Sequence, residues 1–265
     1  METLFEIIEE TADFLAVNKP AGLVCHPTKG DRLSSLVSRV RLHYERRGEP
    51  VSVHIVNRLD RETSGVTLLA KNPVAAGEFG RLWEARRVRK LYSAIVHGQV
   101  ESDSGFIDAP LGRDESSAVA IKDCVRSDGA AAQTVYRSLS RFAAQGRPFT
   151  LVELEPKTGR KHQLRVHLAS LGHPIVGDKL YGGCEDDYLA LVQDRLDDAA
   201  RERLILPWQA LHAGYLAFSW RGRDWAFAAP PEPWFTEFLP RDLAGPQPVT
   251  LPPIESRPSW ILKRR

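Results

Sequence analysis

The most informative part of the sequence is Val56–Gly65, which reads VNRLDRETSG. It sets the carboxylate of Asp60 between Arg58 and Arg61, in a turn that leads into an apolar strand expected over 66–70. Side chains on a loop in front of a rigid strand are well placed to project into a cleft. Aspartate is also common in turns that only shape a loop, so the residues by themselves leave both interpretations open.

On either side of this stretch, the spacing of apolar residues predicts a series of strands and helices. Strands are expected over 13–17, 66–70, 90–96, 134–139, 149–154, 214–220 and 224–228. Helices are expected over 34–44, 75–86, 160–171 and 186–203, and hairpins and loops over 97–130. Because strands and helices are interspersed without an internal repeat or a break in composition, the pattern predicts one mixed α+β domain over 10–228.

The composition is that of a globular protein with an ordinary core. Of the 265 residues, 43% are hydrophobic and 26% are charged, a balance typical of globular domains. The three cysteines are far apart in sequence, which argues against a disulfide framework, and we expect a cytoplasmic monomer. The N-terminus lacks a secretory apolar segment and no stretch approaches the ~18 apolar residues of a membrane helix, so we expect no membrane partner.

Positive charge is unevenly distributed along the chain. The formal net charge is only +2, but basic residues gather in 39–41, 46–47, 58–61, 81–90 and 157–165, whereas 185–202 is acidic. The basic clusters would form an electropositive cleft if the fold brings them together. A solvated basic surface is compatible with the same pattern.

The stretch VNRLDRETSG resembles the central motif of the RluA-type pseudouridine synthases, usually written His-Arg-Leu-Asp-x-x-Thr-Ser-Gly, with Asn57 in place of the usual histidine. Several long motifs at compatible spacing are far more specific than one short pattern. The further stretches that agree, in order, are VNKPAGLVCHP (17–27), VRKLYSAIVHG (88–98), TGRKHQLRVHLASLGHPIVGDKLYGG (158–183) and QALHAGYLAF (209–218). The chain is therefore similar to this family over about residues 13–220.

The resemblance implies a fold and an activity. The implied fold is α+β, with a mixed, largely antiparallel sheet and flanking helices and loops around a central catalytic cleft. It would occupy 1–230, and the Pro-rich tail 231–265 would lie on the surface or be partly disordered. The implied activity is isomerisation of a specific uridine to pseudouridine in ribosomal or transfer RNA, without a cofactor and without a DNA partner.

The resemblance also implies roles for individual residues. Asp60 would be the catalytic carboxylate that acts on a flipped uridine, Tyr92 would lie against the target base, and Arg165 would form an ion pair with Asp60. Without the family, Tyr92 could be an ordinary core residue of its strand, and Arg165 part of a solvated basic helix face. The residues expected to contact RNA are Arg58, Lys90, Arg160, His162 and Leu211.

The chemistry of the reaction is compatible with these residues. Breaking the C1′–N1 bond and forming C1′–C5 needs a nucleophile and a closed pocket, and attack at C1′, glycal formation and addition at C6 all remain open for Asp60. His162 and His167 are five residues apart, which no helical metal pair uses, so we expect no metal site.

Two rival functions stay open. One is a catalytically silent RNA-binding or ribosome assembly factor on the same fold. The other is a glycosidase acting on nucleosides, which would need a second carboxylate such as Glu62 or Asp178 to protonate a leaving group.

Overall fold

The structure, a computed structural model, describes residues 5–26, 33–49 and 51–243. Its helices are α1 (Leu36–Arg47), α2 (Pro73–Glu84), α3 (Gln163–Ser170), α4 (Glu185–Val192), α5 (Asp198–Leu204) and α6 (Pro233–Thr236). Its strands are β1 (Glu6–Glu10), β2 (Phe14–Lys19), β3 (His54–Ile55), β4 (Ser64–Ala70), β5 (Val88–His97), β6 (Ser104–Asp108), β7 (Leu111–Arg113), β8 (Asp123–Val125), β9 (Gln133–Ala144), β10 (Arg147–Pro156), β11 (Leu211–Trp220) and β12 (Arg223–Ala228). Within the described residues, no helix is long and apolar enough to cross a membrane.

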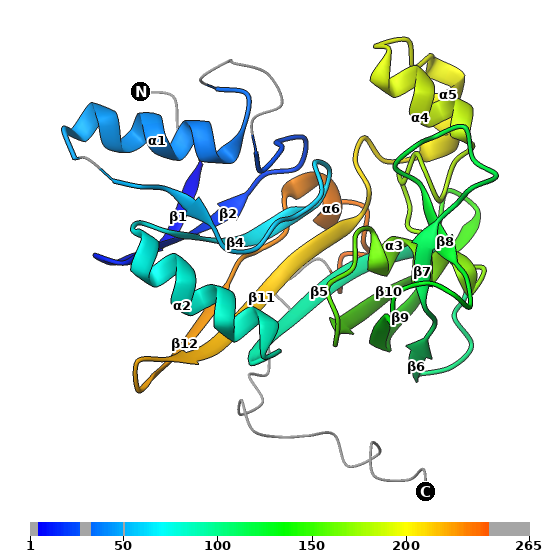
Figure 1. Ribbon diagram of the computed structural model, residues 1–265. Helices are drawn as coiled ribbons and strands as arrows, with labels where there is room; N and C mark the ends of the chain where they lie inside the picture. The colour runs from blue at the N-terminus through cyan, green and yellow to red at the C-terminus, as the bar shows by residue number, and fades with distance from the viewer. Residues whose placement is uncertain (1–4, 27–32, 50, 244–265) are drawn as a thin grey trace, which may run out of the picture.

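A ten-stranded mixed sheet forms the frame of the molecule (Figure 1). Its main path runs β1-β2-β4-β11-β5-β10-β9-β6, with β3 paired to β4 and β12 paired to β11. The one parallel pair recorded among its strands joins β4 to β11, and the other pairs are antiparallel. Strands β7 and β8 form a small separate sheet. This arrangement confirms the predicted α+β class with a mixed, largely antiparallel sheet.

Strand β11 lies between the two halves of the large sheet, although it is late in the sequence. On one side it pairs with β4 and on the other with β5. One core cluster packs β2, β4 and α2 against β11 and β12, and a second packs β5 and β10 against α3 and α6. Helix α1 covers a third cluster with β2. The junction between the halves is where residues from both can meet.

Side-chain caps fix the start of two predicted helices, α1 and α2. The Ser35 side chain accepts a hydrogen bond from the Ser38 N–H and begins α1, as expected of a serine N-cap. The Asn72 side chain accepts from the Ala75 N–H and Pro73 occupies the first turn of α2, where its missing N–H costs nothing.

The predictions for two other helices need correction. Helix α3 begins at Gln163 rather than Arg160, because the Gln163 side chain accepts hydrogen bonds from the Thr158 hydroxyl and the Arg160 N–H and holds that segment as a loop. The helix expected over 186–203 is two helices, α4 and α5. The break follows from Asp194, which adopts a left-handed backbone at φ 52°, and from Asp197, which caps α5.

The part of the C-terminal region that the structure describes packs onto the domain. Phe235 of α6 and Leu239 are buried in the core cluster formed by β5 and β10. Residues 244–265, the remainder of the expected Pro-rich tail, lie outside the described residues.

Candidate active site

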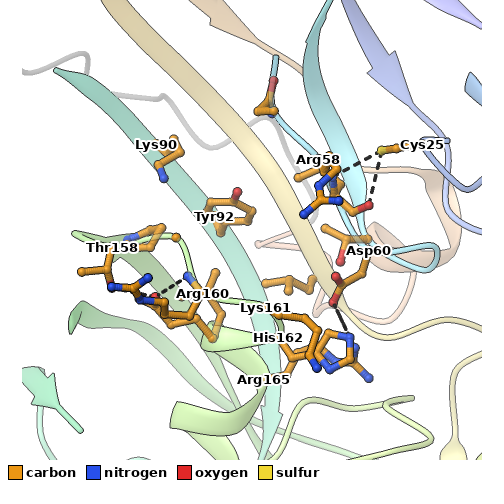
Figure 2. A pocket seen from close by; sticks show the side chains of 18 of the residues that line it. Cys25, Arg58, Asp60, Lys90, Tyr92, Thr158, Arg160, Lys161, His162 and Arg165 are labelled. Carbon is orange, nitrogen blue, oxygen red and sulfur yellow. Dashed lines mark hydrogen bonds and ion pairs between the residues drawn. The ribbon is translucent and has the colours of Figure 1, made fainter. Parts of the chain in front are cut away.

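A cavity of about 540 Å³ lies where the loop carrying Asp60, the face of β5 and the loop preceding α3 meet. Figure 2 shows Asp60 and Arg165 on one side of it and Lys90 on the other, with Tyr92 between them. Every residue predicted for the site lines this cavity: Arg58, Asp60, Lys90, Tyr92, Arg160, His162, Arg165 and Leu211. The fold therefore brings together residues drawn from four distant parts of the sequence.

Asp60 is held by a guanidinium that is itself anchored. Arg165 donates from Nη1 to Asp60 Oδ2 at 2.9 Å, and from Nε and Nη2 to the two oxygens of Asp178 at 2.7 and 2.9 Å. Asp178 is fully buried, whereas the side chain of Asp60 keeps 30% of its surface exposed. Arg165 thus joins a buried structural carboxylate to one that reaches the cavity.

The buried carboxylate of Asp178 is stabilised in its charged form. Burial by itself raises its pKa, but the Arg165 guanidinium and the N–H groups of Leu180 and Tyr181 outweigh burial and lower the pKa below its usual value. Gly177 places Asp178 here with φ +78°, and a Cβ at Gly177 would stand 2.2 Å from the Trp208 oxygen. Only glycine tolerates that approach.

The loop before Asp60 is fixed by two polar side chains. Asn57 donates to the Val66 oxygen and accepts from the Leu68 N–H, at 3.2 and 2.7 Å, which ties the loop to β4. The Cys25 thiol lies against Leu59, donating to its oxygen and accepting from its N–H. Asn57, where the resembled motif usually has histidine, therefore serves as a structural bridge in this chain.

The residues after Asp60 are fixed to the start of β11. Thr63 accepts from the Gln209 side chain at 2.6 Å, and Ser64 bonds His212 Nδ1 at 2.8 Å. Gly65, at φ +116°, lies so close to β11 that a Cβ would stand 2.3 Å from the Ala213 oxygen. The Thr-Ser-Gly part of the motif thus permits the parallel contact that sets Asp60 over β5.

Tyr92 and Leu211 come from neighbouring strands. Ala94 of β5 pairs with Leu211 of β11, and Tyr92 lies two residues earlier on the same strand, so its side chain and that of Ala94 share one face. Burial, and next the charge of Asp60, raise the pKa of the Tyr92 hydroxyl. Tyr92 therefore keeps its proton at neutral pH while its ring faces the cavity.

The charges around the cavity are asymmetric. Among the described residues that line it, Asp60 is the single carboxylate, whereas the cationic side chains are Arg58, Lys90, Arg160, Lys161 and Arg165. Such a lining attracts a polyanion and leaves one carboxylate to react.

Comparisons with known proteins agree with this arrangement. The family model described as RNA pseudouridylate synthase matches residues 13–170. The chain belongs to the RNA pseudouridine synthase family. Within that family it resembles the RluA type, and its members are isomerases.

Individual relatives cover most of this chain. The uncharacterized RNA pseudouridine synthase YlyB of Bacillus subtilis is 36% identical over 244 residues, which is 90% of this chain and 70% of that protein. The ribosomal large subunit pseudouridine synthase D of Nitrosomonas europaea is 36% identical over 211 residues, 80% of this chain and 57% of that protein. The structure of human RNA pseudouridylate synthase domain containing 1 superposes with a TM-score of 0.68 at 28% identity, covering 87% of this chain and 86% of that one.

His162 lies between Tyr181 and Asp60. The Tyr181 hydroxyl accepts the Asp123 N–H at 3.0 Å and lies 2.9 Å from His162 Nδ1, and His162 Nε2 lies 3.9 Å from Asp60 Oδ2. Burial, followed by the positive charge of Arg165, lowers the pKa of His162 to about 4. His162 is therefore neutral at pH 7 and faces the loop that carries Asp60.

Sequence reasoning missed several residues of this synthase site. Trp83, Cys25 and Lys161 line the cavity. Trp83 lies in a predicted helix, and Cys25 and Lys161 lie in motifs shared with the family, but nothing in the sequence indicates that these side chains face the cavity. The sequence suggests Asp178 only as the second carboxylate of a glycosidase, and not as a partner of Arg165. Its role becomes visible only from its two hydrogen bonds with Arg165, which sequence spacing does not reveal.

The two carboxylates that a glycosidase would use lie elsewhere. Asp178 is bound by Arg165, and Glu62 accepts from Lys179 Nζ at 3.0 Å and from the Gln209 N–H. Neither lines the cavity. Across the described residues, no three His, Cys, Asp or Glu side chains are grouped so that they could hold a metal ion.

Proposed function

We propose that this chain isomerises a specific uridine to pseudouridine in ribosomal or transfer RNA, with Asp60, Tyr92 and Arg165 as its catalytic residues. The observation that carries the proposal is Asp60: the single carboxylate among the described residues that line the cavity, held by Arg165 and exposed toward a cationic pocket. The Nitrosomonas relative is a ribosomal large subunit pseudouridine synthase, which supports ribosomal RNA as one substrate class.

The reaction conserves every atom of the uridine. The C1′–N1 bond breaks and a C1′–C5 bond forms, while C5 loses a proton and N1 gains one. Whether Asp60 attacks C1′, takes the 2′ proton or adds at C6, it must begin as a carboxylate. Arg165 donates to Oδ2 of this carboxylate at 2.9 Å and thereby fixes its orientation. Since Arg165 occupies Oδ2, the Oδ1 oxygen remains for the substrate.

Tyr92 would act on the detached base. Its ring can hold uracil by stacking while the base rotates within the cavity. Because burial keeps its hydroxyl protonated, it can donate a hydrogen bond to a base carbonyl or exchange a proton near C5.

The cations would offset the cost of exposing the base. Flipping a stacked uridine costs a few kcal/mol, and each phosphate neutralised by Arg58, Lys90 or Arg160 contributes favourable binding energy. Leu211, buried at the start of β11, would form part of the apolar floor.

The silent RNA-binding factor is the second candidate, and turnover by the natural protein distinguishes the two functions, whereas an Asp60 variant tests the reacting group. Tritium release from RNA labelled at uridine C5 measures the loss of the C5 proton. Asp60→Asn should bind total RNA as the natural protein does and release no tritium, because an amide cannot act as the carboxylate does. Asp103→Asn, an exposed carboxylate paired with Arg141, is the matched control and should retain full activity.

Two results would contradict the proposal. Turnover by pure Asp60→Asn protein would show that the carboxylate is not the reacting group. Absence of tritium release from the natural protein, with RNA binding intact, would favour the silent factor. Mapping pseudouridine in total RNA with and without the gene would identify the target.

A further inference from the structure

The cavity extends beyond the residues assigned to the uridine. Its far end is lined by Trp83, in the last turn of α2, and by Lys90, two residues before Tyr92 on β5. Residues two apart on a strand point to the same face, about 7 Å from one another. Lys90 therefore lies one step along the cavity floor from the expected position of the target base.

Strand register places Trp83 one step further. The Trp83 ring lies 6.0 Å from Phe218, and Phe218 pairs with Val88, the residue two before Lys90 on β5. With increasing distance from Asp60, the floor of the cavity is therefore formed by Tyr92, then Lys90, and then the Trp83 indole near Val88. The order is an aromatic ring, a cation and a second aromatic ring.

Neither the indole N–H of Trp83 nor the ammonium of Lys90 has a polar partner among the described residues. Of the described residues, none accepts a hydrogen bond from the Trp83 indole or forms an ion pair with Lys90, and burial lowers the pKa of Lys90. Placing an unpaired ammonium in a half-buried position costs free energy. That cost is offset when an anion binds there.

The end of α2 holds Trp83 in a fixed position. Arg86 and Arg87 donate backbone N–H groups to the oxygens of Trp83 and Leu82, which closes the helix in a Schellman motif. Arg86 occupies the left-handed position at φ 55° where glycine is usual. A side chain on a closed helix end loses little entropy when a base stacks on it.

We propose that Trp83 and Lys90 form a second nucleotide site, which takes the base and the phosphate of a nucleotide next to the target uridine. This inference rests on the proposed function and deepens it. The substrate is then an RNA segment in which a neighbour of the uridine is also unstacked from its duplex, as in a loop, a bulge or a single strand. Aromatic side chains accept any base in this way, so the site selects for RNA shape rather than for a particular base.

The test measures binding only, with two fluorescently labelled probes: a uridylate hexamer and a hexamer of the same backbone without bases. Trp83→Leu keeps an apolar side chain against Phe218 but removes the stacking ring. It should weaken uridylate binding about 5- to 150-fold, the range given by ~1–3 kcal/mol of stacking. Binding of the abasic hexamer should not change, and Trp83→Phe should restore most of the affinity.

Lys90→Met tests the phosphate half of the site. It should weaken both hexamers alike and lower the salt slope by about 0.7, the value for one phosphate contact on a single strand. Trp225→Leu is the matched control for the loss of an indole, because Trp225 lies on β12 and does not line the cavity. Circular dichroism spectra establish that each variant is folded.

Specific outcomes overturn the inference. They are equal uridylate binding by Trp83→Leu and the natural protein, equal losses for Trp83→Leu and Trp83→Phe, or an unchanged salt slope in Lys90→Met. None depends on turnover. If tritium release fails while the hexamer results hold, the proposed function is wrong and the nucleotide site stands; the reverse pattern removes only the nucleotide site.

Discussion

Arg165 divides its guanidinium between two carboxylates, giving one N–H donor to Asp60 and two to Asp178. The two-donor fork fixes the orientation of the guanidinium, and the remaining N–H then has one direction in which to point. The position of Asp60 therefore depends on a carboxylate that does not reach the cavity.

Arg165→Lys should reduce the chemical step by about 100-fold or more, because a point charge cannot hold both carboxylates and a small misplacement of a catalytic group has that effect. RNA affinity should change little. Single-turnover tritium release at saturating enzyme, with binding measured across a salt series, separates the two effects. Arg160→Lys is the control and should change affinity alone. A normal saturated rate with reduced affinity would make Arg165 a phosphate contact.

Asp178→Asn should lower the free energy of unfolding by about 3 kcal/mol or more, because it leaves the buried Arg165 guanidinium short of a charged partner. Urea unfolding followed by circular dichroism measures the change. Asp103→Asn, from an exposed pair, should have little effect on the same measurement. Equal stability of the two variants would mean that Asp178 does not anchor Arg165.

His162 should contribute to the pH dependence of stability. Its pKa falls from 6.5 in the unfolded chain to about 4 in the fold, so between these values the unfolded state binds more protons. Stability is then fully present above pH 6.5 and declines as the pH falls toward 4. His162→Asn, in which asparagine tolerates the left-handed backbone at φ 54°, should show a shallower decline in urea unfolding at pH 7, 6, 5 and 4.5.

Nitrogen-15 spectra provide a direct check on the same residue. At pH 6 the natural protein should show His162 neutral, because burial and the positive charge of Arg165 lower its pKa to about 4. A charged His162 at pH 6 would contradict the assignment.

Chelation by EDTA should leave turnover unchanged on a short RNA that folds without magnesium. The exchange of a C–N bond for a C–C bond needs no Lewis acid, and no cluster of metal-ligating side chains occurs in the described residues. Tritium release with and without EDTA measures the effect. Activity lost to EDTA and restored by zinc would show that the reaction depends on a metal.

Local patterns predicted most of the longer elements, but not β1, β3 or α6, and not the contacts between elements. The alternation of Tyr92, Ala94 and Val96 indicated β5, and the serine and asparagine before the first two helices are found as caps. The predicted start of helix α3 lies before the observed one because the Gln163 side chain holds the preceding segment as a loop. Helical periodicity does not encode this interaction.

The site could be located from the sequence only through family resemblance. Asp60 and Arg165 are 105 positions apart, and spacing alone assigns neither to the other. The anchoring role of Asp178, the contact between His162 and Tyr181 and the presence of Trp83 in the cavity depend on three-dimensional packing. These are the features that only the structure could supply.

The central place of β11 has a consequence for synthesis of the protein on the ribosome. The strands on either side of it, β4 and β5, are complete by residue 97, but β11 begins at Leu211. Pairings between such distant segments form late because a long loop must close first. An emerging chain therefore carries Asp60 on a loop whose supports at Gln209, His212 and Ala213 have not yet been translated. We expect ribosome-bound chains that end before β11 to be inactive, and activity to begin only when nearly the whole domain has left the exit tunnel.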